Sequence, residues 1–561
     1  MKSKTQKIVI LLILGLVFPL ILNYNFRLSN DFKHKVDKPR TSATYDYIII
    51  DALATTNTTY YGNWSWARAQ PWCTTGDGTK EYPYIIENVT IIYPPAIDCL
   101  TIRNSRKYFI VRNCTFKDIP VASFAGIKLN NVTNANIIDN HAYNNSVGIY
   151  LDDCYYNNIS GNTVSNNSLG IYLYYCYNNT VSGNTANYND DGIYLEESDD
   201  NTISGNTANE NSQNGIYSYF CGYNNITGNT ANDNSDSGIS FENDCNYNII
   251  SENYVNTNNY NGIYFYQCNY NTISNNLVNG SGEMGITLHW YSSNNTIVDN
   301  IANYNEQIGI ELYDYCENNT VSNNVVSFNR LSGIGIYDYS NYNILTENLL
   351  FNNTSGVYID NGDNNSIYAN FFSKNFEHAF DDGIDNKWNN TVIGNYWDNH
   401  TAPDISPQDG IVDTSYIYIS GPAGSIDYLP IAEDGVPIIT VNSPIEGGRF
   451  GNAAPTFSLT VTDIYLVSMW YTLDDGQHNY TFTGLFGTIG QSAWDAMSDG
   501  TITITFYVLD IAGNIGTADI TIGKNIPEEF DPTIIIVIVV ISIVGGVAVL
   551  AGLYIFMKKR A

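Results

Sequence analysis

The sequence from about Gly126 to Gly356 repeats one unit of roughly 22–24 residues. Clear copies are GIYLDDCYYNNISGNTVSNNSL, from Gly148, and GIYLEESDDNTISGNTANENSQN, from Gly192. A glycine recurs in every copy, at positions 126, 148, 170, 192, 215, 238, 262, 285, 309, 333 and 356. An asparagine recurs in step with it, at positions 140, 162, 184, 206, 229, 253, 276, 300, 324, 348 and 370. Such a chain is expected to fold as a stack of similar units.

Each copy holds three short extended segments separated by Asn, Gly, Ser and Asp, which predicts strands and turns. In the copy at Gly148, Ile149 and Leu151 alternate with Tyr150 and Asp152, so only one face of the strand is apolar. A helix could not bury this period-two pattern. A unit this short has no core of its own, and stacking would bury the apolar columns continuously.

The repeat therefore predicts a solenoid. Leucine-rich repeats have a similar period, but they need several leucines and a helical or 3₁₀ segment in each unit. A three-sided parallel β-helix over residues 126–395 fits better. Stacked asparagines would bond each other and the turn backbone, and both columns would supply corners that tolerate left-handed backbone. We interpret both columns as structural, because a functional site needs one place and these residues occur in every coil.

The composition is acidic, with 24 Lys and Arg against 56 Asp and Glu and a formal net charge of −32. This balance argues against nucleic acid and anionic membrane surfaces as partners. Between Lys128 and Lys374 the only cationic side chain is Arg330. Lyases and epimerases that act on acidic sugars need positive groups or a bound metal. The acidic composition instead suits Ca²⁺ or a salty exterior.

Both ends of the sequence carry targeting features. Residues 1–24 place lysines before an apolar stretch, which predicts a signal peptide or an N-terminal anchor. Residues 534–557 are uncharged and apolar and precede a basic tail at 558–561, which predicts a transmembrane helix and a cytoplasmic tail. The bulk of the chain is then extracellular. Glycosylation sequons agree with this location, although an Asn- and Thr-rich repeat also produces such triplets by chance.

Six of the nine cysteines share one column of the repeat, where serine replaces them in other copies: Cys154, Cys176, Cys221, Cys245, Cys268 and Cys316. Exchange with serine predicts a small buried corner position, occupied by a free thiol or by a bond between neighbouring coils. Cys73 and Cys99 lie outside this column. Our hypothesis for them is a disulfide that staples the N-terminal cap.

Distinct segments flank the repeats. Residues 45–125 hold several tryptophans and the string GDGTKEYPYIIENVTI, and they would cap the open first coil. Residues 396–432 would form the exit cap. At these residues the chain resembles the NosD-like family of secreted right-handed β-helix proteins, which share a GT-x-x-x-PYII-x-N opening, NNTISGN coils and a GNYWDN…DGI-x-D…DYLP exit. The resemblance implies a right-handed β-helix over about residues 45–432 and an association with copper delivery to nitrous oxide reductase.

The repeat period is absent from residues 436–523. In TITITFYVLDIAGNIG, Ile502, Ile504, Phe506 and Val508 alternate with polar residues and tyrosine before a turn, and this segment resembles an Ig-like β-sandwich of surface proteins. The predicted fold class is therefore all-β: a right-handed parallel β-helix solenoid followed by an Ig-like β-sandwich, plus a C-terminal transmembrane helix.

The second and fourth residues after each repeat glycine form one outward-facing strip. Tyrosines and carboxylates interleave along it, which suits a neutral polysaccharide because rings stack on C–H faces and acids accept bonds from hydroxyls. The alternative is that tyrosine suits strand surfaces and stacks on its neighbours in adjacent coils. The candidate ligand-binding residues are Tyr150, Tyr172, Tyr174, Tyr194, Glu196, Tyr217, Tyr219, Tyr264 and Tyr266.

Candidates for chemistry are weaker. Paired acids occur along the turns, but none has a unique partner, so we predict no catalytic residue. The exit segment carries a spaced run of acids that could fold around Ca²⁺, made of Asp398, Asp404, Asp409 and Asp413. Copper needs His, Met or thiolate at close quarters, and the six histidines are scattered, with Met284 the only methionine of the helix.

We therefore expect a membrane-anchored extracellular protein that binds polysaccharide or cell-surface glycan, or builds envelope contacts, without catalysis. One alternative is a carbohydrate-active enzyme, either a hydrolase or a Ca²⁺-dependent lyase, and another is NosD-type copper maturation. A unique acid pair in the strip, at a groove floor, would favour the enzyme. Uniform coils would favour binding, and converging His, Met and Cys would favour copper.

Overall fold

The computed structural model describes residues 43–119, 123–405, 410–432, 436–462, 466–474, 476–510 and 514–524. The chain divides into two compact units, Met1–Ser212 and Gln213–Ala561. The predicted signal or anchor at 1–24, the predicted transmembrane helix at 534–557 and the tail at 558–561 lie outside the described residues. Within the described ranges, no helix is both long and apolar enough to cross a membrane.

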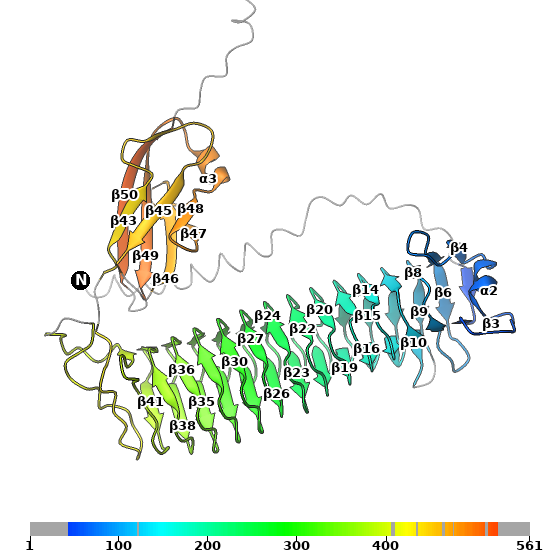
Figure 1. Cartoon of the computed structure of the whole chain (residues 1–561), viewed down its shortest axis with the longest axis horizontal. Coiled ribbons are helices and arrows are strands. Elements are labelled where there is room, and N and C mark those ends of the chain that lie inside the picture. Colours follow the sequence, from blue (N-terminus) through cyan, green and yellow to red (C-terminus); the bar gives the residue numbers. More distant parts are fainter. Residues whose placement is uncertain are drawn as a thin grey trace, which may run out of the picture. The chain divides into compact units, whose positions relative to one another are not determined.

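The first unit consists of coils, and each coil contributes one short strand to each of three sheets, as predicted (Figure 1). Sheet 1 carries the strands at the repeat glycines, in the order β3 (Tyr61–Gly62), β2 (Ile48–Asp51), β7 (Leu100–Ser105), β10 (Ala125–Val132), β13 (Val147–Asp152), β16 (Leu169–Tyr174) and β19 (Asp191–Glu196). Sheet 2 contains β4 (Cys73–Thr75), β5 (Tyr84–Glu87), β8 (Phe109–Arg112), β11 (Ala135–Ile138), β14 (Asn158–Ser160), β17 (Thr180–Ser182) and β20 (Thr202–Ser204). Sheet 3 contains β1 (Ala43–Tyr45), β6 (Val89–Ile92), β9 (Thr115–Lys117), β12 (His141–Tyr143), β15 (Thr163–Ser165) and β18 (Thr185–Asn187).

The second unit contains coils of the same kind. Its sheet 1 is β21 (Ile216–Tyr219), β23 (Ile239–Glu242), β26 (Ile263–Tyr266), β29 (Ile286–His289), β32 (Ile310–Tyr313), β35 (Ser332–Tyr337), β38 (Ser355–Asp360) and β41 (Glu377–Asp381). Its sheet 2 is β22 (Asn225–Thr227), β24 (Ile249–Ser251), β27 (Thr272–Ser274), β30 (Thr296–Val298), β33 (Thr320–Ser322), β36 (Ile344–Thr346) and β39 (Ser366–Tyr368). Its sheet 3 is β25 (Tyr254–Asn256), β28 (Leu277–Asn279), β31 (Ile301–Asn303), β34 (Val325–Ser327), β37 (Leu349–Phe351), β40 (Phe371–Ser373) and β42 (Tyr396–Trp397).

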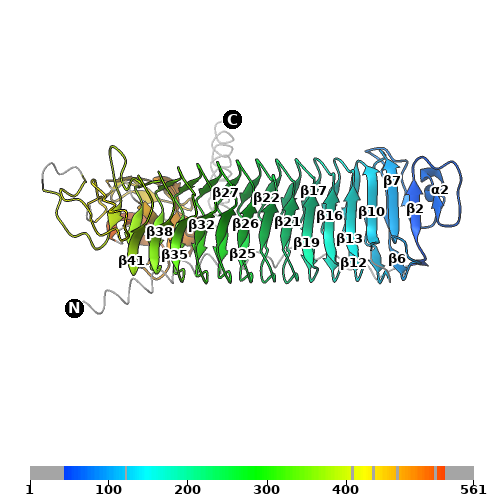
Figure 2. The ribbon, with the colours of Figure 1, turned by 90° about the horizontal axis from the view of Figure 1, so that it is seen from below.

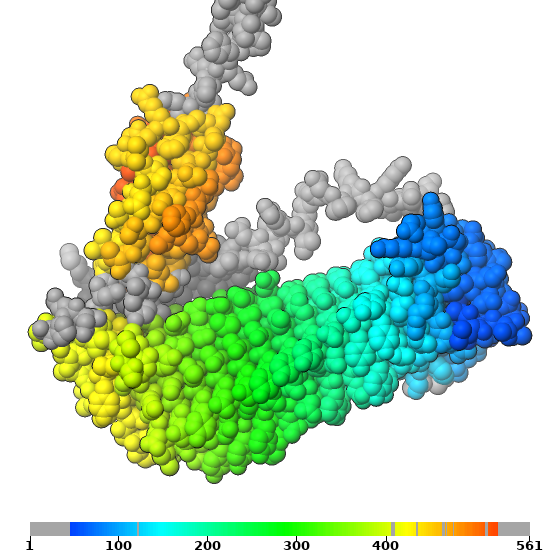
Figure 3. All heavy atoms as spheres, in the orientation of Figure 1, coloured from blue at the N-terminus to red at the C-terminus, as the bar shows by residue number. Residues whose placement is uncertain are grey.

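Coils stack in parallel register, so equivalent residues form columns. In the first unit Ile149 pairs with Ile171 on the inward side, while Tyr150 pairs with Tyr172 on the outward side. The inward isoleucines are fully buried. In the space-filling view, successive coils pack against one another (Figure 3). Stacking thus buries the apolar columns, as the alternation predicted.

Buried asparagines form ladders at all three corners of the coils. In the predicted column, the Asn162 amide donates to the Asn184 side chain at 2.9 Å and to the carbonyl of Ile137 at 2.8 Å. Two further ladders, which our sequence analysis did not identify, run through Asn157 and Asn179 and through Asn145 and Asn167. The interpretation of asparagine as a structural residue is confirmed.

The predicted backbone reason for the two columns is wrong. In the asparagine column the left-handed residue precedes the asparagine, as at Asp139 (φ 53°) before Asn140. The repeat glycines do not have positive φ; they allow close approach, because a Cβ at Gly170 would lie 2.3 Å from the carbonyl oxygen of Gly192. Backbone proximity, and not handedness, therefore requires these glycines.

All nine cysteines are buried free thiols. The column cysteines make bonds of the same kind as the corner asparagines: the backbone of Cys176 donates to Ser198 Oγ at 2.9 Å, and its own thiol donates to the carbonyl of Tyr174 at 3.3 Å. The predicted Cys73–Cys99 disulfide is absent. Cys73 lies on β4 of sheet 2, whereas Cys99 directly precedes β7 of sheet 1, so the two side chains belong to different sides of the coils.

Both ends of the coils carry caps. In the first unit, α2 (Trp64–Arg68) lies beside β2 and β3, and its Trp64 ring stacks on Tyr84 at 4.6 Å. In the second unit the GNYWDN segment ends the coils, where the indole of Trp397 and the backbone of Asn395 both donate to the buried carboxylate of Asp427.

Two small sheets follow the exit cap. One is β43 (Ile439–Ser443), β45 (Thr456–Val461) and β48 (Phe486–Thr488), and the other is β44 (Arg449–Phe450), β50 (Ile515–Lys524), β49 (Gly500–Asp510), β46 (Leu466–Thr472) and β47 (Tyr480–Phe482). They share one core with α3 (Gln491–Ala496), in which the predicted alternating residues of β49 are buried. The assignment of this module as Ig-like stays a prediction.

Candidate functional site

The outer face of sheet 1 in the first unit is a closed stack of rings, which we call the tyrosine ladder: Tyr150, Tyr172 and Tyr194. Neighbouring ring centroids lie 4.8 and 5.0 Å apart at interplanar angles of 8° and 14°. The ammonium of Lys128 lies 4.5 Å from the centroid of Tyr150, and the Tyr172 hydroxyl donates to Glu196. Because each ring covers its neighbour, this part of the predicted strip fits the structural alternative.

In the second unit the same column is interrupted. Tyr217, Tyr264 and Tyr358 remain, but the register places small or acidic residues at the positions between them, namely Ser240, Thr287, Glu311 and Gly335. The strands involved lie side by side on one face (Figure 2). Where rings are missing, the face holds a depression of about 440 Å³, which we call the groove.

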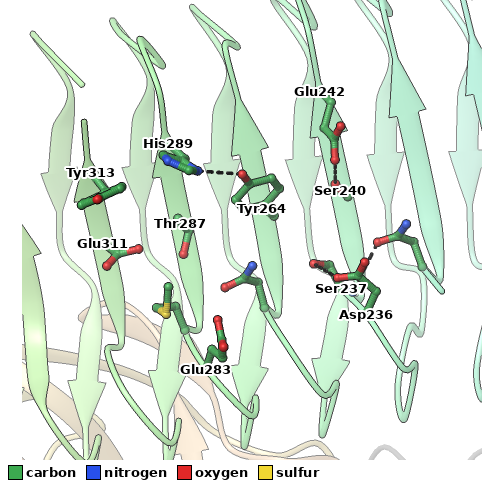
Figure 4. Close-up of a pocket in the computed structure, with 13 residues that line it drawn as sticks. Asp236, Ser237, Ser240, Glu242, Tyr264, Glu283, Thr287, His289, Glu311 and Tyr313 are labelled. Carbon is green, nitrogen blue, oxygen red and sulfur yellow. Dashed lines mark hydrogen bonds between the residues drawn. The ribbon is translucent and has the colours of Figure 1, made fainter. Parts of the chain in front are cut away.

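The groove lies over β23, β26, β29 and β32 and is floored by their outward side chains (Figure 4). The turns before these strands supply its edge. The residues that line it are Asn214, Asp236, Ser237, Ser240, Glu242, Asn261, Tyr264, Glu283, Met284, Thr287, His289, Glu311 and Tyr313.

Glu311 is a buried acid of the groove. It stands in the column where tyrosine is usual, and only 7% of it is exposed. Burial, with the nearby negative charge of Glu283, raises the pKa of Glu311 to about 7. Gly335, its neighbour in the next coil, has no side chain, and the ring of Tyr337 occupies the space where a Cβ would lie. Glu311 is therefore buried with the Thr287 hydroxyl beside it and without a Lys or Arg in the groove lining.

His289 is fixed beside it on β29. Its Nδ1 lies 2.7 Å from the Tyr264 hydroxyl, and its ring packs against Tyr266 and Tyr313 at centroid distances of 5.5 and 5.0 Å. Burial lowers the pKa of His289. At neutral pH the imidazole is therefore uncharged, and it adds no positive charge to the groove.

The groove is rich in acidic residues and contains a buried amide oxygen without a partner. None of its lining residues is Lys or Arg, while four are acidic: Asp236, Glu242, Glu283 and Glu311. The amide oxygen of Asn261 makes no hydrogen bond, although only 9% of this residue is exposed. The Thr287 hydroxyl lies beside the Glu311 carboxyl group and acts to lower its pKa, against the larger effect of burial. Buried polar atoms are normally paired, so the Asn261 oxygen lowers the stability of the folded chain.

The predicted ligand-binding residues fall into two groups. Five lie in the first unit: Tyr150, Tyr172, Tyr174, Tyr194 and Glu196. Of the four in the second unit, Tyr264 lines the groove, Tyr266 supports His289, and Tyr217 donates to Glu242 at 3.1 Å, while Tyr219 packs on Phe220. Sequence reasoning did not single out Glu311, Glu283 or His289. The signal that could have found them is the interruption of the tyrosine column.

The predicted calcium residues are engaged within the exit cap. Asp398 accepts from His378 Nε2 at 2.8 Å, and Asp404 and Asp413 accept from backbone amides of Gly410 and Ile405. Asp409 lies outside the described residues. Across the ranges that the structure covers, no group of three or more His, Cys, Asp or Glu side chains is placed to hold a metal. Calcium binding here stays a prediction.

Two family models match the chain. One, described as periplasmic copper-binding protein (NosD), matches residues 84–261, and one described as right handed beta helix region matches residues 191–350. No curated protein matches the chain in sequence.

Several solved structures resemble the chain. The A-module of mannuronan C-5 epimerase AlgE4 from Azotobacter vinelandii has 16% identity and a TM-score of 0.38 over 47% of this chain and 84% of its own. The Dettilon tailspike protein has 15% identity and a TM-score of 0.40 over 79% and 85%. DFA-IIIase from Arthrobacter chlorophenolicus A6 has 13% identity and a TM-score of 0.31 over 51% and 82%.

The groove does not fit copper. Copper sites combine several imidazole, thioether or thiolate ligands, whereas one histidine and one methionine, His289 and Met284, line the groove among carboxylates. The cysteines are buried at the coil corners, where the column thiols donate to backbone carbonyls. No role for copper is therefore derived.

Proposed function

Since the chain is a NosD-like right-handed β-helix repeat protein, we propose that it is an extracellular glycan-binding protein whose binding site is the groove of sheet 1. The observation that carries this proposal is the interruption of the outward column. Three residues stand where other coils have tyrosine, namely Ser240 on one side of Tyr264 and the neighbouring pair Thr287 and Glu311 on the other. A depression of about 440 Å³ takes the place of the stacked rings. This volume is in the range of small-ligand sites and suits a few sugar residues.

The chemistry of the groove favours an uncharged glycan. Tyr264 and Tyr313 supply aromatic surface for the C–H faces of sugar rings, while the carboxylates can accept hydrogen bonds from hydroxyls. A polyuronate would bring carboxylates next to Glu283 and Glu242 without any cation to neutralise them. Electrostatic repulsion therefore disfavours acidic chains.

The proposed location rests on the two ends of the sequence. The basic and apolar residues 1–24 are an export signal or anchor, and residues 534–557 anchor the chain in the membrane from its C-terminus. On this proposal, residues 43–524 are outside the cell.

Binding tests this proposal directly. The full-length chain in detergent is incubated with immobilised neutral glucans, mannans and galactans and, separately, with alginate and polygalacturonate. We expect retention on at least one neutral glycan and none on the acidic ones. Tyr264→Ala should weaken retention at least ten-fold, whereas Tyr172→Ala, the same change in the tyrosine ladder, should not. Failure to bind any neutral glycan, or equal effects of the two variants, would contradict the proposal.

A further inference from the structure

We infer that the groove also hydrolyses the glycan that it binds, with Glu311 as the general acid and Glu283 as the carboxylate that activates water. This inference rests on the proposed function, because binding and cleavage use the same groove. It adds a reaction to a surface for which the fold itself requires none.

The buried carboxyl group of Glu311 has the Thr287 hydroxyl beside it but no cation among the lining residues of the groove. Neighbouring coils place Thr287 and Gly335 beside it in the register, and no cation in the groove pairs with it. Burying a carboxyl group without a cation costs free energy, and the tyrosine found at this position in other coils would avoid that cost. A residue that opposes stability in a concave surface is a candidate for function.

Glu283 is placed to act with it. It lies in the turn before β29, one coil away from β32, and both carboxyl groups line the same groove (Figure 4). Glu283 is less buried than Glu311, and its negative charge contributes to the raised pKa of Glu311. The pair therefore contains one carboxyl group that still carries a proton in about half of the molecules at pH 7 beside a second, less buried acid, which is the division of roles that glycoside hydrolysis uses.

The surroundings can hold the substrate. The hydrogen bond between Tyr264 and His289 fixes both rings, and the ring of Tyr313 lines the same depression. The aromatic surface can contact the C–H faces of a sugar and hold a glycosidic bond over Glu311. Tyr264 and His289 are thus positioning residues.

The reaction balances with water alone. Glu311 transfers its proton to the glycosidic oxygen as the bond between that oxygen and the anomeric carbon breaks. A water molecule forms a new bond to the anomeric carbon, and Glu283 accepts the proton that this water loses. The proton on Glu283 then returns to Glu311 through solvent after the two products leave. No oxidant, reductant or metal is needed.

The test uses the full-length chain in detergent with a neutral glycan that it retains. In ¹⁸O-labelled water we expect shorter chains that carry one ¹⁸O at each new reducing end, measured by mass spectrometry. Glu311→Gln and Glu283→Gln should each reduce kcat at least about 100-fold while glycan retention and thermal unfolding show folded, binding-competent protein. Asp360→Asn, a matched change on β38 outside the groove, should leave cleavage unaltered.

The outcomes separate the two proposals. Retention of a glycan that stays intact would overturn hydrolysis and leave the binding function standing, whereas no retention would overturn the binding function itself. Unsaturated products without ¹⁸O would replace hydrolysis by elimination. If Glu311→Gln raised only KM and left kcat and its pH profile unchanged, Glu311 would be a binding residue and the inference would be wrong. Cleavage that falls as pH rises above about 7 would support Glu311 as the acid.

Discussion

The tyrosine ladder and the groove occupy the same face of the same kind of sheet, yet they differ in what the outward column contains. In the ladder, Tyr150 and Tyr172 stack at 4.8 Å and cover each other. In the groove, Thr287 and Glu311 stand in the corresponding positions, and the space of the missing rings is open. The comparison teaches that a repeat protein can form a depression where outward tyrosine rings are missing, because the backbone and the buried columns stay unchanged.

The two regions also differ in what they contribute to stability. Stacked rings bury apolar area and favour the folded chain. The groove instead buries a carboxyl group and leaves the amide oxygen of Asn261 without a partner, which disfavours folding. The coils around the groove can tolerate this loss of stability because asparagine ladders hold their corners. The same asparagine ladders hold the corners of the coils that carry the tyrosine ladder.

The largest expected effect tests that shared framework. Asn162 in the first unit and Asn300 in the second make the same set of bonds, to the amide above, the amide below and a backbone carbonyl. Asn162→Ala and Asn300→Ala should each lower the free energy of unfolding by about 3–5 kcal/mol, because each leaves several buried groups unpaired. Chemical denaturation measures this. A cost at only one of the two sites would show that the corners differ as well as the faces.

The next effect concerns the buried acid. The folded-state pKa of Glu311 is raised from 4.5 to about 7, so the folded protein keeps a proton that the unfolded chain loses. Wild-type stability therefore falls as pH rises from about 4.5 to about 7. Glu311→Gln should remove this dependence and stabilise the protein by up to about 3 kcal/mol at pH 8, at 1.36 kcal/mol per pKa unit, and by little at pH 4.

Unfolding curves of both proteins at pH 4, 6 and 8 give this difference. Glu196→Gln in the ladder region is the matched control, and we expect no comparable gain from it. A gain at pH 8 that persists unchanged at pH 4 would mean that protonation of Glu311 is not its cause.

Much of the coil architecture could be predicted from the sequence because it depends on local alternation and on a period that every copy repeats. Ile149 and Leu151 had to face inward whatever the rest of the chain did. The prediction of a Cys73–Cys99 disulfide was wrong because the sequence does not show which sheet each cysteine belongs to. The second and third asparagine ladders were missed because Asn157 and Asn167 stand among many other asparagines.

The groove was missed for a different reason. A search for what repeats selects the tyrosines, and five of the nine predicted ligand-binding residues lie in the first unit, where rings such as Tyr150 and Tyr172 cover one another. The informative residues were those that break the tyrosine column, such as Thr287 and Glu311. Both lie in the predicted strip, but neither was among the predicted ligand-binding residues. Burial decides their meaning, since an exposed Glu311 would be an ordinary surface acid, and burial depends on the neighbouring coils.

Restoring a tyrosine to the outward column should turn the groove back into a stack of rings. Thr287→Tyr places a ring next to Tyr264 and fills the depression, so glycan binding should weaken at least ten-fold while the protein stays folded. Thr320→Tyr, the same change on the outward side of β33 in sheet 2, is the control and should leave binding intact. Affinity gels or calorimetry measure both. Unchanged binding by the Thr287 variant would place the ligand elsewhere on the coils.

The smallest expected effect compares one hydroxyl in the two regions. Tyr172 donates to Glu196 in the ladder, and Tyr264 bonds His289 in the groove. Tyr172→Phe and Tyr264→Phe should each cost only about 0.5–1.5 kcal/mol of unfolding free energy, because each removes one partly exposed hydrogen bond. Only Tyr264→Phe should also weaken glycan binding, by a few-fold, since the imidazole it orients would be free to turn. Equal binding by both variants would show that His289 is held in place by its ring contacts with Tyr266 and Tyr313 alone.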